Sequence, residues 1–187
     1  MPNPTAPVSK MDAGSRDDQP LTERRLIDCG DLNMRIARDG TWFYHGSPIG
    51  RKPLVKLFAS VLRREENGEY WLVTPAERGR VEVEDAPFIA VELAVEGSGR
   101  EQVVRFRTNL DDWTEAGPER PIRIEPGEER SGPRPYVLVR DGLEALIARP
   151  VFYELVALAG PKGDGAQEMG VWSKGAFFPL SAPGASG

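Results

Sequence analysis

The sequence predicts an α+β protein made of two similar lobes, each a β-hairpin, a helix and a second β-hairpin. Three observations predict this internal structural repeat. Residues 34–83 alternate around a tight turn, carry one amphipathic helical segment, and then alternate again. Residues 136–180 show the same order in a shorter form. Residues 86–108, between the two, have the pattern of a long antiparallel strand pair that joins the lobes.

The composition limits the class of protein. A chain of 187 residues fits one domain, or two small lobes that share a core. The net charge of −5 disfavours nucleic acid as the main partner, because phosphate binding needs a basic surface. The single cysteine, Cys29, excludes an internal disulfide and a cysteine-based zinc cluster. No apolar run is long enough to cross a membrane, and we expect neither a cofactor nor a metal.

The ends of the chain suggest the boundaries. Residues 1–20 are rich in proline and polar residues and lack the apolar core of a signal peptide, so we expect a disordered tail and a cytoplasmic protein. Residues 21–84 would form the N-terminal lobe. Residues 85–181 would form the C-terminal lobe, with the central hairpin and the second copy of the repeat, and residues 182–187 a flexible tail.

The N-terminal lobe begins with a short helical turn over residues 22–30, which Thr22 would cap. A strand over residues 34–37 follows. It turns at Asp39-Gly40, a dipeptide that supplies the positive φ angles of tight hairpins, into an aromatic strand over residues 42–45.

The main helix begins at Gly50-Arg51-Lys52-Pro53, because proline is tolerated in the first turn. Apolar residues at three- and four-residue steps then form one face: Leu54, Leu57, Phe58, Val61 and Leu62. Arg63 and Arg64 would end the helix, where positive charge complements its dipole. Strands over residues 70–73 and 80–84 flank a polar connection.

The middle of the chain is mostly strand. Residues 86–96 alternate most clearly and turn at Gly97-Ser98-Gly99 into residues 103–107. Residues 109–113 begin a loop or short helix. In the segment rich in proline and glycine that follows, Ile122 and Ile124 indicate a short edge strand.

The second copy then matches the first in three successive elements. Arg140-Asp141-Gly142 corresponds to Arg38-Asp39-Gly40, and Pro150 corresponds to Pro53. Val171-Trp172-Ser173 corresponds to residues 72–74. Shared order in three elements favours a true structural repeat over chance likeness.

The two copies differ at two places. Arg51-Lys52 becomes Ala148-Arg149, and the polar loop Thr74–Arg78 becomes the short turn Ser173-Lys174-Gly175. If the two copies share only their architecture, we expect the functional residues to be those that are present in the first copy and absent from the second.

The stretch GTWFYHGSPIGRKPLVKLFASVLRRE, followed by YWLVTPAERGRVEVEDAPF, resembles a proteobacterial family known as domain of unknown function 1285. The resemblance runs from about Asp31 to Ala159, and further matching motifs are Thr108-Asn109, residues 139–145 and residues 152–155. It implies an α+β protein with repeated hairpin–helix motifs and a role in signal transduction or ligand binding. It supplies no catalytic residues.

Arg51 and Lys52 form one candidate site, because free N–H groups, the helix dipole and two cations can together hold an anion. The alternative is a solvated pair of charges. Thr74, Glu77 and Arg78 form another, because loops often carry function. Equally, Thr74 could only shape the corner while Glu77 pairs with Arg78, and both interpretations stay open.

His45, the only histidine, could act as an acid, a base or a metal ligand. It ends an aromatic strand and has no companion histidine, which favours a structural role. Asn109 could hydrogen-bond a ligand or its own turn. Asp111, Asp112 and Glu115 could bind a cation but lack calcium-loop spacing, which favours capping of a short helix.

Together these features predict a non-enzymatic protein with a regulatory role that binds a small, anionic molecule in a cleft between the lobes. We assign no catalytic residues. The expected ligand-binding residues are Arg51, Lys52, Thr74, Glu77, Arg78, His45 and Asn109. One alternative is a protein-interaction adaptor with exposed aromatic residues such as Trp42 or Phe177. Another is a hydrolase built on carboxylates and His45.

Overall fold

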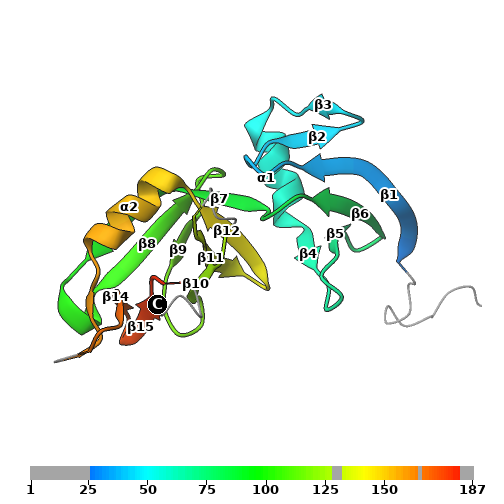
Figure 1. Ribbon diagram of the computed structural model, residues 1–187. Coiled ribbons are helices and arrows are strands. Elements are labelled where there is room, and N and C mark those ends of the chain that lie inside the picture. Colours follow the sequence, from blue (N-terminus) through cyan, green and yellow to red (C-terminus); the bar gives the residue numbers. More distant parts are fainter. Residues whose placement is uncertain (1–25, 128–131, 164–165, 182–187) are drawn as a thin grey trace, which may run out of the picture.

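The computed structural model describes residues 26–127, 132–163 and 166–181. In these residues two six-stranded sheets, one three-stranded sheet and two α-helices form two lobes (Figure 1). Neither helix is long and apolar enough to span a membrane. The expected tails over residues 1–20 and 182–187, and the proposed cap Thr22, lie outside the described residues.

The N-terminal lobe is a six-stranded sheet with strand order β3-β2-β1-β6-β5-β4. Neighbouring strands are antiparallel except for the central pair, β1 and β6, which is parallel. The helix α1 lies between this sheet and the C-terminal lobe (Figure 1). The bounds are β1 Ile27–Ile36, β2 Trp42–Tyr44, β3 Ser47–Pro48, α1 Lys52–Ser60, β4 Leu62–Arg64, β5 Tyr70–Val73 and β6 Glu77–Val83.

The C-terminal lobe has a second six-stranded sheet, with strand order β10-β11-β12-β7-β8-β9, and a small sheet, β13-β14-β15. Its central pair, β12 and β7, is again parallel. The helix α2 packs closely on β7 and β14. The bounds are β7 Phe88–Glu96, β8 Val103–Thr108, β9 Trp113–Glu115, β10 Ile122–Glu125, β11 Arg134–Arg140, β12 Leu143–Ile147, α2 Arg149–Ala157, β13 Gly160–Pro161, β14 Met169–Ser173 and β15 Ala176–Pro179.

The predicted α+β repeat is confirmed. Hairpin β1-β2, helix α1 and hairpin β5-β6 recur as β11-β12, α2 and β14-β15, and the antiparallel pair β7-β8 lies between the two copies in the chain. Ile122 and Ile124 lie on β10, which is an edge strand as predicted. The turns differ in detail: Asp141 and Gly142 both have positive φ, whereas in the first copy only Gly40 does.

Three local predictions were wrong. Residues 27–30 are strand, not a helical turn, because β6 offers this segment main-chain partners, as in the bond from Ile27 N–H to the Ala76 carbonyl (3.0 Å). The main helix ends at Ser60, because residues 62–64 pair with β5 instead. The expected capping of a short helix by Asp111, Asp112 and Glu115 is also wrong, because residues 109–112 form the alternative, a loop, in which Asp111 takes a positive φ of 66°, and β9 begins at Trp113.

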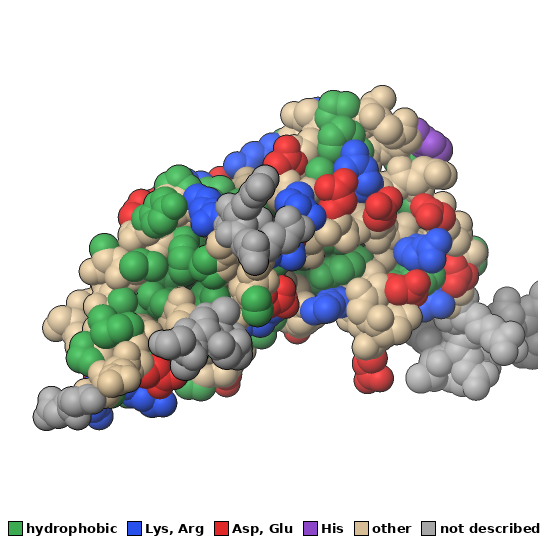
Figure 2. Space-filling model, viewed as in Figure 1, with side chains coloured by type: hydrophobic (Ala, Val, Ile, Leu, Met, Phe, Trp, Pro, Cys, Tyr) green, Lys and Arg blue, Asp and Glu red, His purple; other side chains and the backbone are tan. Residues whose placement is uncertain are grey.

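Side-chain exposure also corrects two expectations. Leu57, placed on the apolar face of the helix, is 62% exposed, and the buried residues of α1 are Val55 and Ala59. Trp42, expected to be exposed for a partner, is 1% exposed and stacks near Phe58. On the face in Figure 2, apolar side chains gather over the C-terminal lobe, whereas charges of both signs mix over the N-terminal lobe.

The two lobes share one apolar core and lock together at the hairpin turns. The core runs without a break from Ile36 and Leu62 in the first lobe to Phe88 in the second. At the turn of the first copy, Gly40 approaches the second lobe so closely that an added Cβ would lie 2.7 Å from Asn109 Nδ2 and 2.8 Å from Ile89 Cγ1. The interface therefore tolerates only glycine here.

This close approach gives the first prediction. Gly40→Ala and Gly68→Ala should both lose about 1–2 kcal/mol of unfolding free energy, because both glycines have a positive φ, 82° and 86°. Gly40→Ala should lose about 1–3 kcal/mol more, because its Cβ overpacks the lobe interface while that of Gly68 meets open space. Urea unfolding of both variants measures the difference, and equal losses would contradict the tight interface.

Candidate functional site

A cavity of about 530 Å³ lies inside the N-terminal lobe, between α1 and one face of the sheet. Its volume lies in the range of small-molecule sites. Side chains from α1, from β1 and β5 and from their connections form apolar walls. These residues are Leu32, Met34, Ile49, Leu54, Phe58, Val61 and Leu72.

The cavity exists because α1 stands away from its own sheet, whereas α2 packs closely on β7 and β14. Leu54 and Phe58, four residues apart, turn one side of α1 toward the cavity. Lys52 and Lys56, also four residues apart, turn the opposite side toward the C-terminal lobe. One short helix therefore separates the cavity from the second lobe.

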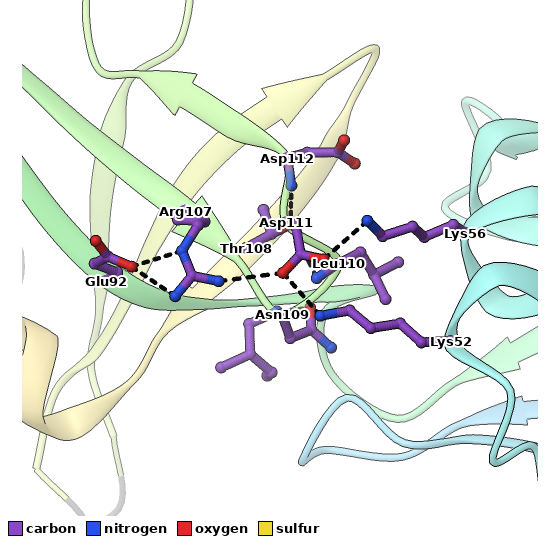
Figure 3. A network of polar contacts seen from close by, with 10 residues as sticks. Lys52, Lys56, Glu92, Arg107, Thr108, Asn109, Leu110, Asp111 and Asp112 are labelled. Atoms are coloured by element: carbon purple, nitrogen blue, oxygen red, sulfur yellow. Dashed lines mark hydrogen bonds and ion pairs between the residues drawn. The ribbon is translucent and has the colours of Figure 1, made fainter.

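An ion cluster holds α1 against the C-terminal lobe (Figure 3). Lys52 Nζ and Lys56 Nζ each lie 2.8 Å from a carboxylate oxygen of Asp111, and Arg107 Nη1 lies 3.2 Å from the same carboxylate. Hydrogen bonds from Lys52 and Lys56 lower the pKa of Asp111 to about 2. One anion that contacts the start of this helix is thus a side chain of the protein itself.

Hydrogen bonds within the turn that carries Asp111 fix its backbone independently of the contact with the lysines. Thr108 is fully buried, and its hydroxyl accepts hydrogen bonds from the N–H groups of Leu110 and Asp112, each at 3.2 Å. Arg107 is also bonded to Glu92 across the β7–β8 pair (Figure 3). Such local bonds fix the backbone of a turn, so Asp111 is presented to the lysines with little freedom left to lose.

A second contact fixes the other end of α1. Arg140 Nη2 donates a hydrogen bond of 2.6 Å to the carbonyl of Ala59, in the last turn of the helix. Carbonyls in a last helical turn lack intrahelical partners, so an arginine there satisfies one of them and complements the helix dipole. The C-terminal lobe therefore holds α1 at both ends.

The mouth of the cavity is the loop between β5 and β6. Thr74 fixes the loop: its N–H and its hydroxyl donate to the Glu77 carbonyl at 2.9 and 3.0 Å, and its hydroxyl accepts from the Glu77 N–H at 3.1 Å. Thr74 thus shapes the corner, in agreement with one of the two open interpretations. The other half of that interpretation fails, because Glu77 does not pair with Arg78.

The Arg78 side chain binds partners other than Glu77. Its guanidinium bonds Asp28 at 3.0 and 3.2 Å and Glu65 at 2.9 Å, and it lies 4.4 Å from the centre of the Trp71 ring. Successive side chains of a strand point to opposite faces of a sheet, and Leu72 lines the cavity, so Trp71 and the Arg78 guanidinium lie on the other face. Glu77 alternates with Arg78 and faces the cavity.

Cys29, on β1, completes the mouth. Its thiol lies 3.6 Å from Glu77 Oε2, to which it donates a weak hydrogen bond. Burial raises the pKa of this thiol, and the negative charges of Glu77 and Asp28 raise it further. The thiol is therefore a weak nucleophile.

The structure brings three of the seven predicted ligand-binding residues together, namely Thr74, Glu77 and Arg78, at this mouth. Lys52 instead contacts Asp111, and Arg51 is the exposed N-cap of α1. Their role in binding an external anion stays a prediction.

His45 and Asn109 lie apart from the mouth. His45 is exposed in the turn after β2 with a φ of 46°, and its ring packs edge-on against Tyr44 at 4.3 Å. Asn109 accepts a hydrogen bond from the Ile89 N–H at 3.1 Å and donates one to the Gly40 carbonyl at 3.4 Å. The amide of Asn109 thus supports the contact between the lobes.

A smaller cavity, of about 310 Å³, does lie between the lobes. Arg38, Arg134 and Arg149 line it together with the buried carboxylate of Asp85, which lies 2.6 Å from Arg134 Nη2. A ligand between the lobes stays a prediction.

Sequence reasoning misses the apolar pocket and the role of Asp111. It places Leu54, Phe58 and Val61 on one face of a helix, but periodicity cannot distinguish a face that packs from one that lines a void. For Asp111 it offers a cation ligand or a cap, whereas the partner Lys52 is more than fifty residues away in the chain. No group of three metal-binding side chains occurs within the part of the chain that the structure describes.

Comparisons with known proteins agree with this architecture. The family model for the N-terminal domain of DUF1285, a domain of unknown function, matches residues 20–86, and the model for its C-terminal domain matches residues 87–180. A crystal structure of a DUF1285 family protein from Silicibacter pomeroyi DSS-3 is similar with 47% identity and a TM-score of 0.78, covering 90% of each chain. One from Shewanella baltica OS155 has 26% identity and a TM-score of 0.53, covering 68% of this chain and 91% of that chain. A search of curated proteins gave no match.

The ion cluster gives a prediction about pH. Asp111 has a folded-state pKa below its ordinary value of 3.8, so its contribution to stability is present above pH 4 and is lost as the pH falls toward 2. Asp111→Asn should therefore melt at a lower temperature than the wild type at pH 7, and the gap should close between pH 4 and pH 2. Melting curves across this range test it. Asp112→Asn is the control, since Asp112 forms no ion pair within the described residues, and a gap that persists at pH 2 would contradict the prediction.

Proposed function

The chain belongs to the DUF1285 family, and we propose that it is a non-enzymatic regulatory protein that binds a small molecule with an apolar body in the N-terminal pocket. Occupancy of the pocket would be passed to the C-terminal lobe through α1. One observation carries this proposal: α1 lines the pocket with one side and is held by the second lobe on the opposite side.

The pocket walls favour an apolar ligand. Each methylene group that leaves water for an apolar site contributes about 0.8 kcal/mol, so a chain or ring system could bind through its body alone. Polar groups at such a site mainly orient the ligand, and here they belong to Cys29, Tyr44, Thr74, Glu77 and Arg78.

The contacts of α1 give the coupling a direction. Removing apolar surface from water would favour movement of Leu54 and Phe58 onto the sheet, which would close the pocket. The bonds to Asp111 and Arg140 pull the helix the other way and keep the pocket open. A ligand and the lobe contacts therefore favour the same position of α1, and each should strengthen the other.

The geometry gives little support to hydrolysis. A general base must lie within hydrogen-bond reach of its partner, and no bond or ion pair joins His45 to a carboxylate in the described segments. The thiol of Cys29, with its raised pKa, is a poor nucleophile at neutral pH.

A second candidate function, binding of a protein partner, is favoured by one observation. On the outer side of α2, Tyr153 is 65% exposed and Val156 44%, and Leu158 follows at 39%. Figure 2 shows apolar side chains gathered over the same lobe. Apolar surface of this kind often marks an interaction site.

The pocket is tested with a neutral apolar dye, N-phenyl-1-naphthylamine, whose fluorescence rises in apolar surroundings. Leu54→Phe should weaken dye binding about tenfold or more, because the larger ring fills the cavity. Leu57→Phe, three residues along the same helix, is the matched control, since Leu57 is 62% exposed and does not line the pocket. Equal affinities for both variants would remove the pocket as the binding site.

The coupling is tested with the same dye. Asp111→Asn should weaken dye binding about threefold to tenfold, although Asp111 does not line the pocket, because α1 loses the contact that holds the pocket open. Asp112→Asn should leave the affinity unchanged. If Asp111→Asn lowers the melting temperature but binds the dye as the wild type does, the pocket and the lobe interface are independent.

A further inference from the structure

We propose that the ligand of the N-terminal pocket carries a cationic head group, such as a primary amine, which binds the Glu77 carboxylate at the mouth. This inference rests on the proposed function and names the class of ligand: an amphiphile with an apolar body and a positive end. Four observations at the mouth lead to it.

The first is the direction of Glu77. On β6, Glu77 shares a face with Gly79 and Val81, and both Glu77 and Gly79 line the pocket. Three hydrogen bonds with Thr74 fix the backbone of Glu77 at the start of the strand. The carboxylate is therefore presented to the mouth by a rigid element.

The second is that the Glu77 carboxylate has acceptor capacity to spare. A carboxylate offers about four acceptor positions. Within the described part of the chain, its one hydrogen bond comes from the Cys29 thiol at 3.6 Å, and it forms no ion pair with lysine or arginine. A thiol is a weak donor, so an ammonium group that replaced it would gain a stronger, charge-assisted bond.

The third observation is that Arg78, the cation next to Glu77, is already paired with other carboxylates. The Arg78 guanidinium points to the opposite face of the sheet, where it bonds Asp28 and Glu65 and covers Trp71. Together with Glu77, the two carboxylates that Arg78 binds outnumber its single positive charge, and among the described residues Arg78 is the only lysine or arginine that lines the pocket. The mouth consequently has a negative potential, which attracts cations and repels anions.

The fourth observation is that the Cys29 thiol lies in this negative potential. Its pKa is raised by burial first and then by the negative charges of Glu77 and Asp28. The same field that disfavours a thiolate at this point would disfavour the carboxylate of a fatty acid. An amine of the same chain length would instead be favoured, because it stays protonated at pH 7.

The test compares three probes that share one apolar tail and differ only in the head: decylamine, decanol and decanoate. Calorimetric titrations at pH 7, each below the concentration at which the probe self-associates, give the affinities. The wild type should bind decylamine about threefold to tenfold more tightly than decanol, and decanoate most weakly. Glu77→Gln should remove the preference for the amine and leave decanol binding unchanged, which also shows that the pocket is intact.

Glu66→Gln is the matched control, because it makes the same change in net charge on an exposed residue that does not line the pocket. It should keep the preference for decylamine. If decanoate binds as well as decylamine, or if Glu66→Gln acts as Glu77→Gln does, the assignment of a cationic head to Glu77 is overturned while the apolar pocket stands. If none of the three probes binds the wild type, the proposed function itself fails.

Discussion

The contact between Asp111 and the two lysines of α1 joins that helix to the C-terminal lobe, and we propose that it sets the distance between the helix and its own sheet. A single exposed ion pair contributes little to stability, because solvent screens it and two long side chains lose freedom. Here one carboxylate meets three cations, and a buried threonine holds the turn that presents it. With Arg140 bonded at the far end of α1, the second lobe contacts the helix at both ends, and in the proposed function it determines whether the first lobe keeps its pocket.

The second copy of the repeat lacks this constraint and packs differently. Val151, Phe152 and Leu155 of α2 are buried, and this helix packs closely on β7 and β14. The turn also differs, since the Ser173 hydroxyl is buried between the Val104 N–H and the Ala116 carbonyl, at 2.9 and 2.7 Å. The helix of the second copy thus packs closely on its neighbours, whereas the helix of the first copy lines a cavity, although both copies have the same order of elements.

The parts of this fold that depend on neighbouring residues could be predicted from the sequence. The hairpin turns at Gly40 and Gly142, the start of each helix at a proline, and the alternating strand Phe88–Glu96 all result from local chemistry. The end of α1 could not be predicted, because pairing of Leu62 with Leu72 overrides the helical pattern. The loop at Thr74–Arg78 was predicted as a site because it is polar and because the second copy lacks it, and both are signals within the chain itself. The pocket gave no such signal, because a void depends on where a helix is held by residues far away in sequence.

An apolar cavity that stays open needs a force that opposes its closure. Water solvates the walls formed by Leu54, Phe58 and Leu72 poorly, so the free energy of the lobe alone would fall if α1 moved onto the sheet. The opposing force acts on the other side of the helix and is electrostatic, which means that it weakens with salt and with low pH while the hydrophobic term does not weaken in the same way. A helix held between two forces of different origin can be moved by a modest change in either one. A ligand that filled the pocket would remove the first force and leave the second unchanged, and the proposed coupling of a ligand in one lobe to the other lobe rests on this difference.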